Sequence, residues 1–337
     1  MIKKSISTLT EGGNLSEHDA YLAIKEILEG KGTHAQMASF LTALRMKGET
    51  PDEITGSVKA MREMAITLKL NSPDAIDTCG TGGDRAGTFN VSTAAAIVAA
   101  GAGVVVAKHG NRAVSGNCGS ADVFEKLGVK ITLHPDEVAK CINTVGIGFM
   151  FAPEFHSAMR HAAEVRREIG IRTVFNILGP LSNPAEVTRQ VVGVYSSDLA
   201  GLFASTLLKL GVKKAYIVHG EDGLDEITVC GKTEIKEIDD EKVLSYTISP
   251  EDFGMVRHSR DEISGGDAAF NRDIIIRILK GSEGARRDIV LLNAAAAIAV
   301  SGKAPNIKDG LALARESIDS GSAYRKLQAL IEFTQKQ

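Results

Sequence analysis

The chain has 337 residues, enough for two domains or for one large domain with an appendage. Hydrophobic residues make up 44% and charged residues 24%, which is ordinary for a globular protein with a core of normal size. The 39 basic and 42 acidic residues leave a net charge of −3, so no general attraction for nucleic acid or for an anionic membrane is expected.

Targeting and redox signals are sparse. No apolar run follows the basic N-terminus as it would in a signal peptide, and no apolar stretch suits a membrane span. The four cysteines are widely separated and form no CxxC pair, which argues against a zinc site or a disulfide framework. We therefore expect free thiols, a cytoplasmic location and no membrane partner.

The N-terminal part of the chain predicts three helices between residues 14 and 66 and no strand. Ser16 is placed to cap the first helix and Thr33 precedes the second. The third helix opens with Thr50-Pro51-Asp52-Glu53, which supplies a capping threonine, a proline at the first helical position and a glutamate at the third. Apolar side chains recur at helical spacing in each segment, so we expect a small helical domain.

From residue 74 onward, short β-branched runs alternate with helical stretches. This alternation predicts a mostly parallel central sheet flanked by helices, and the fold class is therefore α/β with a small N-terminal helical domain. The predicted strands are 104–106, 130–133, 190–194 and 215–218; the helices between them are 120–127, 136–145 and 198–210; and helical stretches near 267–280, 286–301 and 307–332 close the chain.

A glycine-dense turn, DTCGTGGD at 77–84, leads through TFNVST at 88–93 into an alanine-rich helix. Glycines let the backbone approach a ligand closely, and a helix that begins just after them directs free N–H groups at it, as phosphate sites require. The turn is neither a Walker P-loop nor a Rossmann fingerprint. Asn90, Ser92 and Thr93 at the helix start are candidates for binding phosphate or metal, although Ser92 or Thr93 could equally be an N-cap.

A second polar motif, KHGNRAVSGNCGSAD at 108–122, follows the predicted strand at 104–106. Ligands of open α/β sheets bind at the carboxyl ends of strands, where Lys108 and His109 are expected. Ser120 opens the next helix, so a cation and a helix N-terminus could together bind an anion. A lone basic cluster is usually a solvated loop, but the neighbouring glycine-rich turn favours ligand binding.

An acidic motif, HGEDGLDE at 219–226, follows the predicted strand at 215–218. Its four carboxylates within six residues repel one another without a cation, and hard oxygen ligands of this kind suit Mg²⁺, which also shares the phosphates of a substrate. The alternative is an ordinary acidic surface turn.

The segment FMFAPEFH at 149–156 is interpreted as an aromatic turn broken by proline. The following helix carries Arg166, and RTVFNILGPLSNP at 172–184 comes next. An aromatic wall beside an arginine suits a flat, anionic aromatic substrate. For Phe151 and Phe155, simple core packing is the favoured interpretation.

Together these segments resemble the anthranilate phosphoribosyltransferase family over essentially the whole chain, in the expected order. The matching segments are GTGGD at 80–84, TFNVST at 88–93, KHGNRAVS at 108–115, GSAD at 119–122, GFMFAPEFHSAM at 148–159, RTVFNILGPLSNPA at 172–185, HGEDGLDE at 219–226, LLNAAAAI at 291–298 and LRMKGET at 44–50. The resemblance implies a fold like that of pyrimidine nucleoside phosphorylases. It places a helical domain at residues 1–70, joined by part of 166–187, and an α/β domain that binds the phosphoribosyl donor at 71–337.

The resemblance implies transfer of the 5-phosphoribosyl group from phosphoribosyl pyrophosphate to the amine of anthranilate, in tryptophan biosynthesis. It implies two Mg²⁺ ions per subunit, a homodimer paired through the helical domain, and association with an anthranilate synthase component. The donor-binding residues would be Gly80, Gly82, Gly83, Asp84, Thr88, Asn90, Ser92, Thr93, Lys108 and Ser120. The anthranilate-binding residues would be Gly80, His109, Asn111 and Arg166, and the metal ligands Ser92, Asp225 and Glu226. No residue stands out as a catalytic acid or base, and charge stabilisation would come from Lys108, Asn111 and His109.

Two alternatives remain open. A pyrimidine nucleoside phosphorylase shares the fold, but that family typically has KHS where this chain has KHG at 108–110. A non-enzymatic relative that binds nucleic acid should show an extended basic face and a degraded anthranilate site, which disagrees with the net charge of −3 and with the presence of His109, Asn111 and Arg166.

Overall fold

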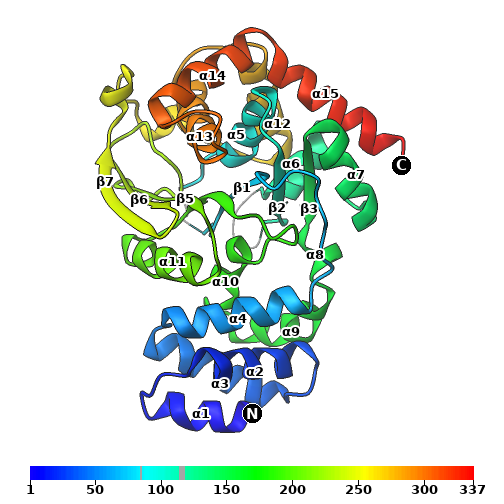
Figure 1. Ribbon diagram of the computed structural model, residues 1–337, viewed down its shortest axis with the longest axis vertical. Helices are drawn as coiled ribbons and strands as arrows, with labels where there is room; N and C mark the ends of the chain where they lie inside the picture. The colour runs from blue at the N-terminus through cyan, green and yellow to red at the C-terminus, as the bar shows by residue number, and fades with distance from the viewer. Residues whose placement is uncertain (84–85, 114–117) are drawn as a thin grey trace.

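The computed structural model describes residues 1–83, 86–113 and 118–337. The N-terminal helices form one end of an elongated molecule and the C-terminal helices the other, with the sheet between them (Figure 1). Asp84 and residues 114–117 lie outside the described residues. Within the described ranges, no helix combines the length and apolarity needed to cross a membrane.

The helical bundle confirms the three predicted helices and their caps. Its members are α1 (Ile2–Thr10), α2 (Glu17–Leu28), α3 (His34–Lys47) and α4 (Pro51–Glu63). The hydroxyls of Ser16, Thr33 and Thr50 each accept a hydrogen bond from the backbone N–H three residues on. The pattern did not predict α1, because its serines and threonines are poor helix formers; it is held by burying Ile2 and Leu9.

Gly56 lets α4 pack closely against α2. A Cβ at this position would overlap the carbonyl oxygen of Glu17 and approach the backbone nitrogen of Tyr21 to 2.8 Å. Gly56→Ala is therefore expected to lower the free energy of unfolding by about 1–3 kcal/mol, despite the better helix propensity of alanine. Urea denaturation measures the change. Gly201→Ala in α11 (Ser197–Lys209) is the control, because no described atom beyond its chain neighbours and the nearby backbone of its own helix lies within 4 Å of the added methyl group. It should be neutral or stabilising. Equal losses in the two variants would contradict the close-packing argument.

The sheet has seven strands in the order β3-β2-β1-β4-β5-β6-β7. The first five are parallel, whereas β6 and β7 form an antiparallel hairpin at one edge. A mostly parallel sheet is thus confirmed. The strands are β1 (Ile76–Gly80), β2 (Val106–Gly110), β3 (Ile147–Phe151), β4 (Arg189–Gly193), β5 (Lys214–Gly220), β6 (Thr233–Asp239) and β7 (Lys242–Ile248).

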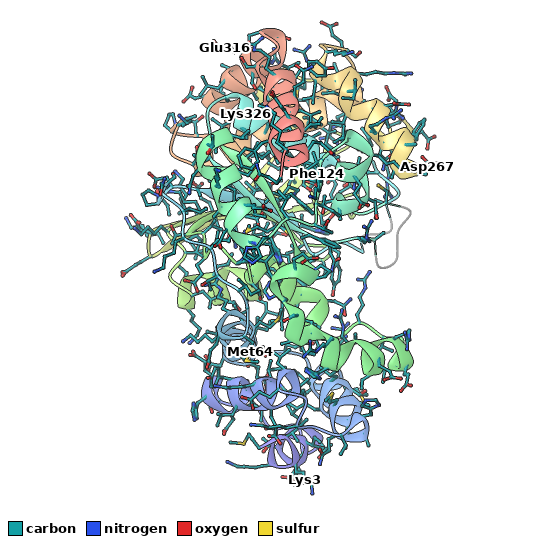
Figure 2. The ribbon with its side chains drawn as sticks, turned by 90° about the vertical axis from the view of Figure 1, so that its right-hand side faces the viewer. Lys3, Met64, Phe124, Asp267, Glu316 and Lys326 are labelled. Carbon is teal, nitrogen blue, oxygen red and sulfur yellow. The ribbon has the colours of Figure 1, made fainter. Side chains whose placement is uncertain are left out.

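Helices cover both faces of the sheet. On one face, the buried alanine-rich helices α5 and α13 pack together and against the C-terminal helices, and Figure 2 shows Phe124 and Lys326 in this part of the molecule. On the other face, α11 shares an apolar cluster with the N-terminal bundle and with α9. The remaining helices are α5 (Val91–Gly101), α6 (Ser120–Leu127), α7 (Pro135–Val145), α8 (Ala152–Phe155), α9 (Arg160–Ile169), α10 (Phe175–Leu178), α12 (Ala268–Leu279), α13 (Ala285–Val300), α14 (Ile307–Asp319) and α15 (Ser322–Gln335), with 3₁₀ turns at Ser157–Met159, Gly179–Leu181, Pro250–Phe253 and Arg260–Ile263.

The strand predicted at 130–133 is wrong, since these residues are in neither helix nor strand. The strand in that part of the chain is β3, at residues interpreted as part of an aromatic turn. Every residue of β3 is buried, as expected for a strand covered on both faces, so it shows no alternation that would have marked it. The aromatic residues of β3 therefore belong to the sheet.

Two other boundaries differ from the predictions. The strand predicted at 104–106 is β2 at Val106–Gly110, so Lys108 and His109 lie in the strand and not in a loop after it. The helical stretch at 307–332 is two helices, broken at Gly321, which has a φ of 73°. The hairpin of β6 and β7 was not predicted.

Candidate functional site

The carboxyl ends of β1 and β4 form a glycine-lined edge beneath the acidic motif. Gly80 and Gly193 are partners in the parallel register of these two strands. A Cβ on Gly80 would overlap the Asp225 carboxylate, and a Cβ on Gly193 would overlap the Asp225 backbone oxygen. The two glycines therefore allow the acidic motif to lie directly on the sheet edge, where open α/β sheets bind ligands.

The structure brings two of the four clustered carboxylates to the glycine turn. Asp225 Oδ2 accepts a hydrogen bond from the Gly82 N–H at 2.8 Å, and Glu226 Oε1 accepts one from the Ser92 N–H at 3.1 Å. Both carboxylates thus face the glycine turn and the start of α5, where a donor phosphate is expected.

The other two carboxylates of this motif serve the turn itself. Asp222 accepts a hydrogen bond from the Thr228 hydroxyl at 2.7 Å, and Glu221 lies 3.7 Å from the Arg257 guanidinium. Glu221 and Asp222 are not among the predicted metal ligands, which are Ser92, Asp225 and Glu226. Within the described ranges, no three His, Cys, Asp or Glu side chains converge in a metal-holding group.

Lys108 lies buried in β2, directly beside the start of α5. Its Nζ donates to the Thr78 carbonyl oxygen and lies 3.4 Å from both the Thr78 and Ser92 hydroxyls. A small cavity next to these groups is lined by Thr78, Gly80, Ser92 and Glu226 among others. The cation, the hydroxyls and the carboxylate thus surround one point at the end of the sheet.

The N-cap of α5 is Asn90, so neither Ser92 nor Thr93 is the cap. Ser92 meets Lys108, while the Thr93 hydroxyl is buried and has no hydrogen-bond partner among the described residues. The Asn90 side chain makes no capping bond. Its Nδ2 donates to the Cys118 carbonyl at 3.2 Å, and its Oδ1 accepts from Asn271 Nδ2 at 3.0 Å.

Three other residues predicted to bind the phosphoribosyl donor are Thr88, Ser120 and Gly83. Thr88 forms an isolated β-bridge with Ser264. The Ser120 hydroxyl at the start of α6 donates to the Asn111 carbonyl at 3.3 Å. The Gly83 carbonyl accepts a hydrogen bond from Arg172, whose guanidinium lies over a tyrosine ring.

The predicted acceptor residues come from β2 and α9. His109 is buried, and desolvation lowers its pKa to about 3, with further lowering from the neighbouring His156. Arg166 is half-buried with its guanidinium 5.5 Å from the Phe175 ring, and desolvation lowers its pKa. Across residues 1–83, 86–113 and 118–337, no hydrogen bond or ion pair holds the Arg166 guanidinium. The Asn111 Oδ1 accepts from the Arg112 N–H at 2.8 Å.

Four polar residues at this site were not assigned from the sequence. Asp77 is fully buried on β1, and desolvation raises its pKa to about 6 against the opposing effect of Lys108. Asn183 donates to Asp77, Asn271 donates to Asn90, and Arg172 holds the glycine turn. The only signal for Asp77 was a carboxylate among strand residues just before the glycine turn.

Comparison with known proteins agrees with this architecture. Residues 3–65 match the helical bundle domain of a glycosyl transferase family, and residues 72–324 match its a/b domain. The chain is 52% identical to the anthranilate phosphoribosyltransferase of Acetivibrio thermocellus over 99% of this chain and 97% of that relative. The crystal structure of the anthranilate phosphoribosyltransferase from Thermus thermophilus has a TM-score of 0.94 and 42% identity, covering 98% of this chain and 99% of that one.

The yeast structures carry ligands. The Saccharomyces cerevisiae anthranilate phosphoribosyltransferase in complex with PRPP and Mg has a TM-score of 0.92 and 32% identity, covering 100% of this chain and 98% of that one. The same enzyme in complex with 4-fluoroanthranilate has a TM-score of 0.90 and 30% identity, with the same coverage.

Proposed function

Since the chain belongs to the anthranilate phosphoribosyltransferase family, we propose that the glycine-lined edge of its sheet carries the family's reaction. The 5-phosphoribosyl group passes from phosphoribosyl pyrophosphate to the amine of anthranilate, giving N-(5-phosphoribosyl)anthranilate and pyrophosphate. The observation that carries this assignment is the meeting of Asp225 and Glu226 with the glycine turn and the start of α5, beside the buried cation of Lys108.

The donor is proposed to lie along the glycine turn. Gly80, Gly82 and Gly83 allow its close approach, and the N-terminal end of α5 faces its phosphates. Thr88, Asn90, Thr93 and Ser120 complete the proposed set, and the buried Thr93 hydroxyl has no hydrogen-bond partner among the described residues. Asp84 was predicted with them and lies outside the described residues.

Ser92, Asp225 and Glu226 fit Mg²⁺, which takes few protein ligands and keeps waters or substrate phosphates in its remaining positions. The yeast relative binds Mg, and we propose two ions per subunit here. When bound, Mg²⁺ supplies positive charge that stabilises the departing pyrophosphate. Lys108 supplies a further cation at the same end of the sheet.

The chemistry requires stabilisation of separated charge more than proton removal. Departure of pyrophosphate leaves positive charge on the ribose carbon, while the aromatic amine of anthranilate is already neutral at pH 7 and can attack. Lys108 and the helix N–H groups stabilise the leaving group. Gly80, His109, Asn111 and Arg166 are proposed to receive anthranilate, with Arg166 facing its carboxylate.

Changing the two carboxylates should alter the metal requirement. The double variant Asp225→Asn/Glu226→Gln is expected to raise the Mg²⁺ concentration for half-maximal rate by about tenfold or more, because two hard anionic ligands become neutral amides. A magnesium titration of the initial rate measures this. Glu221→Gln is the matched control, since that carboxylate lies in the same motif but pairs with Arg257. An unchanged titration in the double variant would remove both carboxylates from the metal site.

Product fluorescence from purified protein, donor, anthranilate and Mg²⁺ tests the proposed function directly. Thymidine phosphorolysis with inorganic phosphate tests the nucleoside phosphorylase alternative and is expected to give no product. Neither activity is expected of a nucleic-acid-binding relative.

The domain division is proposed as residues 1–70, joined by part of 166–187, and residues 71–337. In support, Val165 and Phe175 share an apolar cluster with the N-terminal bundle, and α9 packs on α2 and α3.

A homodimer through the helical domain is also proposed. In support, Met46 on α3 of this domain is an apolar residue that is 83% exposed. The cytoplasmic location and the association with an anthranilate synthase component stay predictions.

A further inference from the structure

A buried polar network lies behind the proposed acceptor residues and joins segments far apart in the sequence. The carboxylate of Asp77 accepts hydrogen bonds from the His109 backbone N–H at 3.2 Å and from Asn183 Nδ2 at 2.7 Å. Asn183 Nδ2 also donates to the Ala107 carbonyl at 3.0 Å, and its Oδ1 accepts from the Ala185 N–H at 2.8 Å. The Asn183 side chain thus fastens the segment that follows Gly179 to β1 and β2.

Two histidines contact this same segment. The His109 Nδ1 lies 3.2 Å from the Gly179 carbonyl oxygen, which can only accept, so this nitrogen carries the hydrogen. His156 is also buried, and burial lowers its pKa to about 4, opposed by the Ser182 backbone. The two rings are 5.1 Å apart, and Nε2 of each is buried with no hydrogen-bond partner among the described residues.

Both imidazoles are therefore neutral at pH 7, and the Gly179 carbonyl holds His109 in one tautomer. With the proton on Nδ1, the His109 ring has an unprotonated Nε2 that can only accept a hydrogen bond. The aromatic amine of anthranilate offers two N–H donors, whereas the opposite tautomer would set an imidazole N–H against them. The tautomer is thus a condition for recognising the amine.

We propose that Asp77 and Asn183 are positioning residues for the acceptor site. They fasten the segment that follows Gly179, whose carbonyl keeps His109 as a hydrogen-bond acceptor at Nε2. This inference rests on the proposed role of His109 in anthranilate binding. Neither residue needs to touch the substrate, because each acts through the position of the Gly179 carbonyl.

The test joins kinetics with the nitrogen spectra of the eight histidines. In ¹⁵N-histidine protein, the ring assigned through His109→Gln should show the Nδ1–H tautomer. In Asn183→Ala, this ring should shift toward the Nε2–H tautomer. The anthranilate KM should rise by about tenfold, and the donor KM should stay within about twofold, as expected for one misplaced hydrogen-bonding group.

The control is Ser317→Ala on α14. It removes a buried hydrogen bond of 2.7 Å from the Ser317 hydroxyl to the Val98 carbonyl. It should lower thermal stability and leave both KM values and the imidazole spectra unchanged. Should Asn183→Ala not fold, Asp77→Asn tests the same network, because its single amide oxygen cannot replace both carboxylate oxygens, which accept from the His109 N–H and from Asn183 Nδ2. The same shifts are expected.

Unchanged tautomers in the folded variants, or equal rises in the two KM values, would overturn the positioning role. A wild-type protein that forms no phosphoribosylanthranilate would instead overturn the proposed function. The two failures are therefore distinguishable in one set of measurements.

Discussion

Replacing Lys108 by methionine is expected to lower kcat/KM by about a hundred- to a thousandfold, the effect of removing a preorganised charged donor from a site of charge separation. Its Nζ lies 3.4 Å from the Ser92 hydroxyl, at the start of α5, with Glu226 bonded to the Ser92 N–H. The steady-state rate with both substrates measures the loss. Methionine keeps the length and apolar stem of lysine, so the buried volume changes little.

Lys326→Met provides the matched control. Like Lys108, Lys326 is partly removed from water and donates from Nζ to a backbone carbonyl, that of Val145, at 2.6 Å. Unlike Lys108, it lies among the C-terminal helices (Figure 2). This variant should keep nearly full activity. A folded Lys108→Met protein that retained kcat/KM within about tenfold of wild type would show that the buried cation only fastens β2 to β1.

The effect of Lys108→Met on Asp77 is a separate matter. Lys108 lowers the pKa of the buried Asp77 carboxyl, which desolvation raises to about 6. Without the cation the Asp77 pKa should rise further. The carboxyl then stays protonated and neutral up to a higher pH than in the wild type, which avoids an isolated buried charge. This proton uptake limits the loss of stability of Lys108→Met. Melting temperatures measured as a function of pH would separate the change in stability from the loss of rate.

Local chemistry predicted much of the site because the motifs are contiguous. Caps at Ser16, Thr33 and Thr50 act within one turn of helix, and GTGGD at 80–84 is a turn whose backbone requirement is local. The resemblance placed Asp225 and Glu226 of the acidic motif at the same site as Ser92, and the parallel strands bring the motif to that edge of the sheet. These features need no knowledge of long-range register.

The network of Asp77 and Asn183 could not be predicted in the same way. The two residues are 106 positions apart, and their bond depends on how residues 179–185 cross β1 and β2. The strand at Ile147–Phe151 was missed for a related reason, since a strand buried on both faces has no polar alternation. The strand before Lys108 was predicted at 104–106, where the valine run lies, whereas β2 is Val106–Gly110 and includes Lys108.

Arg166→Ala is expected to raise the anthranilate KM by about thirty- to a hundredfold while leaving the donor KM within about twofold, since a charged hydrogen bond contributes roughly 2–3 kcal/mol. The guanidinium is half-buried beside Phe175, and no described residue holds it by a hydrogen bond or an ion pair. A cation partly removed from water without a partner binds a carboxylate more strongly than an exposed one.

Arg167→Ala is the matched control, because Arg167 is the next residue of α9 and is exposed. It should change neither KM. Arg166→Lys should recover part of the affinity, because lysine keeps the charge but loses the planar fork that binds a carboxylate through two parallel bonds. Equal increases of the anthranilate and donor KM in Arg166→Ala would contradict a contact of this arginine with the anthranilate carboxylate, since such a contact affects one substrate only.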